Sequence, residues 1–103
     1  MVSILDRLGR LKLPQELVER FGWDERSAFG ILYQGGVLRL IPLQPETEGP
    51  YGEVRTLDRT GRLVLPAGLR QWLGLRPGSV ARVHVTEAGE LMLDFAAPKV
   101  AAR

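Results

Sequence analysis

One segment of this sequence occurs twice, 52 residues apart, and this repeat constrains the fold more than any other feature. Residues 5–17 read LDRLGRLKLPQEL and residues 57–69 read LDRTGRLVLPAGL, with nine of thirteen positions identical. The correspondence continues through Gly22 and Gly74 and through Ser27 and Ser79. A repeat this dense in 103 residues indicates two copies of one supersecondary unit, at residues 1–43 and 54–95.

Each copy is predicted to run strand, tight turn, strand, short helix and β-hairpin. Both turns read Asp-Arg-X-Gly-Arg, in which Asp bonds its own backbone and Gly adopts a positive φ. Pro14 and Pro66 are expected at the first helical position, and Gly22 and Gly74 at the left-handed end of the helices. The predicted strands cover residues 2–6, 10–13, 28–34 and 37–42, then 54–58, 62–65, 79–86 and 90–95.

Neither copy is large enough to enclose a core, because its strands are short and few. Together they supply eight strands and two helices, so we expect the strands of each copy to complete the sheet of the other in a single closed barrel. Residues 44–53 are polar and rich in Pro and Gly, which predicts a linker that spans roughly 30 Å when extended. Residues 96–103 are expected to be a short tail.

The composition excludes several kinds of site. The chain has no cysteine, so it has no disulfide, no thiolate zinc site and no cysteine nucleophile. We find no Ser/His/Asp set, no phosphate-binding glycine loop and no paired carboxylates, and the lone His84 cannot build a metal site. We therefore expect no enzyme activity and no cofactor. No apolar run reaches the roughly 18 residues of a membrane span and no signal peptide is visible, so a cytoplasmic location is expected.

The string LDRTGRLVLPAGLRQWLGLRPGSVARVHV resembles the AbrB/MazE/SpoVT looped-hinge family of prokaryotic DNA-binding proteins. The resemblance covers residues 54–95 nearly completely and residues 3–42 in a degraded form. It implies a swapped-hairpin β-barrel, mainly β with two short helices, which two chains normally form together. Here one chain would form it as an intrachain pseudo-dimer. The duplication is similar to that of the cell-division regulator MraZ, whose copies are longer.

The family grips DNA through basic residues on the first strand, after the turn glycine and on the short helix. Carried over by position, these residues are Arg55, Arg62 and Arg70 in the second copy and Arg10 in the first. Because Ser3 and Val18 replace two of them in the first copy, the second copy is expected to dominate the basic face.

Three further basic residues, Arg7, Arg59 and Lys12, are expected to add phosphate contacts. Twelve of the fourteen basic residues are arginine, which suits phosphate binding, although a GC-rich genome gives the same bias. Arg10 and Arg62 have a structural alternative, which is to pair with Asp6 and Asp58 and hold the turns.

The expected function is that of a nucleoid-associated transcription regulator that binds double-stranded DNA as a monomer or as a homodimer of complete barrels. An antitoxin of a toxin–antitoxin pair is an alternative, weakened because only eight residues follow the last predicted strand. A non-DNA-binding assembly or adaptor barrel is another, with a protein partner on the first helix, where Glu16, Val18 and Glu19 suit a protein better than a phosphate.

Overall fold

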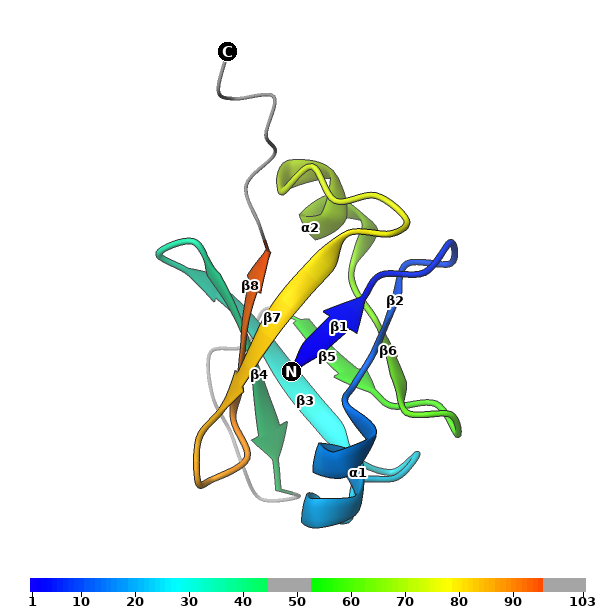
Figure 1. The fold of residues 1–103 in the computed structure, drawn as a ribbon, viewed down its shortest axis with the longest axis vertical. Coiled ribbons are helices and arrows are strands. Elements are labelled where there is room, and N and C mark those ends of the chain that lie inside the picture. The colour runs from blue at the N-terminus through cyan, green and yellow to red at the C-terminus, as the bar shows by residue number, and fades with distance from the viewer. Residues whose placement is uncertain (45–52, 96–103) are drawn as a thin grey trace.

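The computed structural model describes residues 1–44 and 53–95. Within them the chain is mainly β with two short helices, as predicted (Figure 1). The elements are β1 (Val2–Ile4), β2 (Arg10–Lys12), α1 (Gln15–Phe21), β3 (Ala28–Gln34), β4 (Val37–Leu43), β5 (Glu53–Thr56), β6 (Arg62–Val64), α2 (Ala67–Trp72), β7 (Val80–Val85) and β8 (Leu91–Phe95). The predicted tail and residues 45–52 of the predicted linker lie outside the described residues, and Glu53 already belongs to β5.

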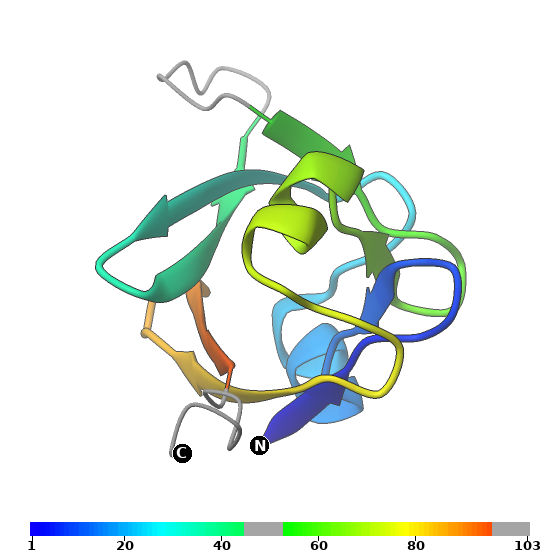
Figure 2. The ribbon, with the colours of Figure 1, turned by 90° about the horizontal axis from the view of Figure 1, so that it is seen from above.

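Eight antiparallel strands form one curled sheet and one short ladder. The six-stranded sheet has the order β1-β7-β8-β4-β3-β5, and β2 pairs with β6. Isolated bridges between Leu5 and Leu11 and between Leu57 and Leu63 connect β1 to β2 and β5 to β6. Figure 2 shows the curl from above, and Figure 1 shows α1 and α2 at opposite ends of it.

Strands from the two repeats pair with each other. Among the described strands, four of the six ladders join a strand of the first repeat to one of the second: β1–β7, β5–β3, β4–β8 and β2–β6. The registers keep the sequence offset. Ser3 pairs with Ala81 and Arg55 pairs with Phe29, and Arg55 and Ala81 lie 52 positions after Ser3 and Phe29. Leu11 pairs with its own counterpart, Leu63, at the centre of the β2–β6 ladder.

The core between these strands is built mostly from leucines of both repeats. Its members are Leu5, Leu11, Leu13, Leu17, Phe29, Ile31, Leu38 and Leu40, with Leu57, Leu63, Leu65, Ala81, Val83, Leu91 and Leu93. At one end, Trp23 stacks on Phe21 and meets Phe29 edge-on, each at 5.0 Å between ring centroids. Because residues from both halves fill one core, burial of its apolar surface stabilises both halves at once.

The helices begin one residue later than predicted. Pro14 and Pro66 have extended ψ angles of 130° and 139°, so they precede the helix as N-cap residues. The carbonyl of Pro14 accepts the backbone N–H groups of Leu17 and Val18. The predicted left-handed glycines are confirmed, with φ of 68° at Gly22 and 69° at Gly74. No helix within residues 1–44 and 53–95 has the length and apolar character needed to cross a membrane.

Candidate nucleic-acid interface

The two Asp-Arg-X-Gly-Arg segments are tight turns that project from the same side of the molecule (Figures 1 and 2). Oδ1 of Asp6 accepts the backbone N–H groups of Leu8 and Arg10, both at 2.9 Å. The backbone N–H of Gly9 donates to the Asp6 carbonyl at 3.1 Å, with φ of 80° at the glycine. The turn at residues 58–62 repeats this arrangement, so both aspartates form turns, as predicted.

Two arginines and two aspartates from the turns form a cluster across the β2–β6 ladder. Nε of Arg10 lies 2.8 Å from Oδ2 of Asp6, and Nη1 of Arg10 lies 3.4 Å from Oδ2 of Asp58. Nε of Arg62 lies 3.7 Å from the same Oδ2 of Asp6. The cluster therefore has no net charge. Arg10 and Arg62 pair with aspartates of the turns and connect the two turns to each other.

Both turn carboxyl groups are held ionised. The backbone N–H of Arg10 is the main cause that lowers the pKa of Asp6, and the Arg10 guanidinium and the Leu8 N–H add to it. Desolvation by burial raises the pKa of Asp58, but hydrogen bonds from the backbone N–H of Arg62 and from Thr60 outweigh it and leave the pKa lowered. Both shifts favour the folded protein over the unfolded chain when the carboxylates are charged.

We expect Asp6→Asn/Asp58→Asn to remove a pH-dependent part of the stability. A lowered folded-state pKa contributes stability that is present above the ordinary value of 3.8 and is lost as the pH falls through the folded-state value. The difference in thermal midpoint between parent and variant should therefore be largest near pH 7 and shrink below about pH 4. Thermal unfolding from pH 7 to 2 measures it, and a gap that stays constant would contradict the prediction. Asp94→Asn, on the exposed surface of β8, is the control.

Each turn is covered by the helix of the other repeat. The Arg70 guanidinium, on α2, lies over Gly9, where an added Cβ would meet its Cζ at 2.5 Å. Nε of Arg70 also donates to the Leu65 carbonyl at 3.1 Å. Val18, on α1, takes the equivalent place beside Gly61. The absence of a side chain at Gly9 thus lets Arg70 lie flat on the turn backbone.

Lys12 brings a cation to the second turn, as Arg70 does to the first. Its Nζ donates to the carbonyl of Thr60. Backbone hydrogen bonds also join each turn to the other repeat. The Leu65 N–H donates to the Gly9 carbonyl and the Leu13 N–H donates to the Gly61 carbonyl, both at 2.9 Å. Basic side chains of both repeats therefore meet at each turn.

The remaining predicted residues differ in their surroundings. Arg7 and Arg59 are exposed at the turn tips, and neither has an ion-pair partner within residues 1–44 and 53–95. Arg55, on β5, instead pairs with Glu53 at 2.9 Å and donates to the Val54 carbonyl. Its counterpart Ser3 is buried. Arg55 is thus not part of the turn contacts, while Arg7 and Arg59 are free to bind an anion.

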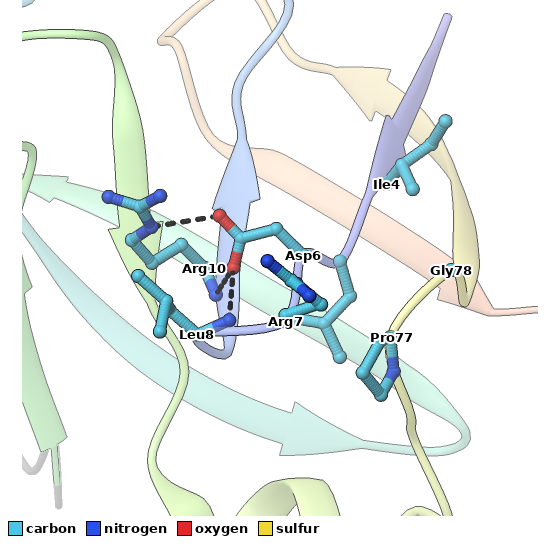
Figure 3. A pocket seen from close by; sticks show the side chains of 8 residues that line it. Ile4, Asp6, Arg7, Leu8, Arg10, Pro77 and Gly78 are labelled. Atoms are coloured by element: carbon cyan, nitrogen blue, oxygen red, sulfur yellow. Dashed lines mark hydrogen bonds and ion pairs between the residues drawn. The ribbon is translucent and has the colours of Figure 1, made fainter.

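A pocket beside the first turn was missed by the sequence analysis (Figure 3). It is a shallow, open pocket of about 320 Å³, lined by Ile4, Leu5, Asp6, Arg7, Leu8, Arg10, Pro77 and Gly78. The sequence feature that could have indicated this pocket is the variable position of the turn motif, which is Leu8 in the first repeat and Thr60 in the second. No group of three His, Cys, Asp or Glu side chains suited to a metal occurs in the described parts of the chain.

Comparison with known proteins gives a likeness of fold. No family model matches this chain, and no curated protein matches it. It is similar to a solved structure, the solution structure of PHS018 from Pyrococcus horikoshii, with a TM-score of 0.53 and 17% sequence identity. The alignment covers 96% of this chain and 92% of that one. At this identity the likeness concerns the fold alone.

Proposed function

We propose that this protein is a transcription regulator of the AbrB/SpoVT type that binds double-stranded DNA at the cytoplasmic nucleoid. The observation that carries the proposal is the pair of exposed arginines at the turn tips, Arg7 and Arg59, which have no ion-pair partner in the described part of the chain. Each is accompanied by a second cation near its turn, Arg70 or Lys12. Two such turns on one side of the molecule match a polyanion better than any small ligand.

The proposal includes the finer description of the fold, an AbrB-type swapped-hairpin barrel formed within one chain as a pseudo-dimer. Strand pairing between the repeats at a constant offset of 52 supports it, as do the two bridges that join the sheet edges to the β2–β6 ladder. Such a chain already holds both copies, so it would act as a monomer or as a homodimer of complete barrels.

The two kinds of arginine have different tasks in this proposal. Arg7 and Arg59 contact phosphates, because a free guanidinium is always charged and donates to two oxygens at once. Arg10 and Arg62 hold the turns in place through Asp6 and Asp58. Arg55 is partly neutralised by Glu53 and contributes less than its position in the family suggests.

Fluorescence anisotropy with a labelled duplex at several salt concentrations tests the proposal. If the four cations Arg7, Arg59, Arg70 and Lys12 each neutralise one phosphate, log affinity should fall with log salt at a slope of roughly −3.6. Arg7→Ala/Arg59→Ala should weaken binding to all sequences alike and make the slope shallower by about 1.8. The matched control is Arg82→Ala, an exposed arginine on β7, which should change neither.

Thermal melts establish that each variant is folded. Binding that shows no salt dependence, or that is indifferent to Arg7→Ala/Arg59→Ala in a folded protein, would contradict the proposal and favour the adaptor alternative.

A further inference from the structure

We infer that the outer face of β1 and β7, together with the pocket beside the first turn, binds an acidic peptide segment of another protein. This surface, the β1–β7 face, is defined by Val2, Ile4, Leu8, Pro77 and Val80. The matching segment carries apolar side chains flanked by Asp or Glu. The inference goes beyond DNA binding and does not depend on it.

Apolar side chains are concentrated on this face. Leu8 is 69% exposed, Val2 54%, Ile4 53% and Val80 43%. These four are half of the eight large hydrophobic side chains that are exposed within the described residues. Val2 and Ile4 point to the same side of β1, and Ile4 lies directly opposite Val80 on β7. Exposed apolar side chains that gather in this way mark an interaction surface more often than scattered ones do.

The pocket gives the β1–β7 face a place for one apolar side chain. Leu8 lies on one side of the pocket, and Ile4 and Pro77 lie on the other (Figure 3). Leu5, which is buried, is also part of the lining. A volume of about 320 Å³ between such walls admits a leucine or phenylalanine side chain of a partner.

The turn itself does not require this apolar character. In the second repeat, Thr56 and Thr60 stand at the positions of Ile4 and Leu8, and the counterpart of Pro77 is Glu25 of the first repeat. The turn at residues 58–62 keeps the same backbone hydrogen bonds as the first turn. The turn therefore forms without a leucine at this position. We infer that the exposed Leu8 contacts another molecule.

The charges around the pocket indicate an acidic partner. Arg7 lines the pocket and Arg76 precedes Pro77; both are exposed, and neither has an ion-pair partner within residues 1–44 and 53–95. Asp6, the acid of the lining, is already paired with Arg10 and Arg62. In a symmetric dimer through this face, Arg7 and Arg76 of one copy would face the same positively charged surface of the other copy. This repulsion disfavours a second copy as the occupant.

The test is an NMR titration of the full-length, ¹⁵N-labelled chain with the synthetic peptide EELFEELLEELF. We expect saturable binding, with the largest shift changes at Ile4, Leu8 and Val80. The peptide KKLFKKLLKKLF, which keeps the apolar residues and reverses the charge, should not bind. Ile4→Thr/Leu8→Thr should weaken binding roughly tenfold or more, because it removes both apolar walls.

The variant has a built-in control for folding. It gives the first repeat the threonines that the second repeat already carries at the equivalent strand and turn positions, and its amide spectrum reports whether the fold is kept. The reciprocal variant, Thr56→Ile/Thr60→Leu, should create a second, weaker site beside the second turn.

Several outcomes would overturn the inference. These are absence of saturable binding, equal binding of the lysine peptide, and shift changes that map away from the β1–β7 face. Light scattering that shows a dimer dissociated by Ile4→Thr/Leu8→Thr would assign the face to a second copy. A loss of DNA affinity in that variant equal to the loss in Arg7→Ala/Arg59→Ala would assign it to DNA instead.

Discussion

Cleaving the chain between Gln44 and Glu53 is expected to yield two fragments that are unfolded alone and that fold when mixed. After cleavage each fragment retains one ladder of named strands, β3–β4 or β7–β8. The four ladders between the repeats are lost, together with half of the shared core. A single hairpin is at best marginally stable in water, so neither fragment can compensate for the entropy of ordering its chain.

Circular dichroism and amide NMR spectra of the separate and mixed fragments measure this directly. The mixture should recover the parent spectrum at a rate that depends on concentration, because folding becomes bimolecular. A cooperative melting transition in either isolated fragment would show that the repeats are independent units.

Leu63→Ala is expected to destabilise the protein by about 2–5 kcal/mol, the range for truncating a fully buried leucine. Leu63 is 0% exposed and pairs with Leu11 at the centre of the β2–β6 ladder, where both repeats meet. The loss would be a large part of the roughly 5–15 kcal/mol typical of a domain this size. Leu11→Ala should cost a similar amount, because the two residues occupy equivalent places.

Urea denaturation of the variants measures the cost. Val64→Ala on the same strand is the control, since Val64 is 42% exposed and should lose less than about 1 kcal/mol. A loss at Val64 equal to that at Leu63 would mean that burial at the β2–β6 ladder does not determine the stability.

Local features of the sequence predicted the elements well. The turn positions followed from Asp and Gly, whose backbone preferences depend on few neighbours. The prediction for β3, residues 28–34, coincides with the structure, and Pro14 is displaced from its predicted position by one residue because its ψ is extended. The pairing of the repeats followed from a size argument: neither copy could enclose a core alone.

The composition of the candidate site was harder to predict. The sequence identified Arg70 and Lys12 as basic, but which turn each one reaches depends on long-range strand pairing that no local pattern encodes. The same holds for Arg10, whose second carboxylate partner is Asp58 of the other repeat. The pocket required the spatial approach of Pro77 to the first turn, 69 positions from Leu8 in the sequence.

Because both repeats belong to one polypeptide, each position can change alone. In a homodimer of identical subunits, a residue such as Val18 would appear at both ends, and any cost of replacing it would be incurred twice. Here α1 carries Val18 where α2 carries Arg70, so one end of the molecule can lose a cation while the other keeps it. The two ends are chemically distinct, so a ligand that spans both of them has a preferred direction, which an exactly symmetric assembly could not impose.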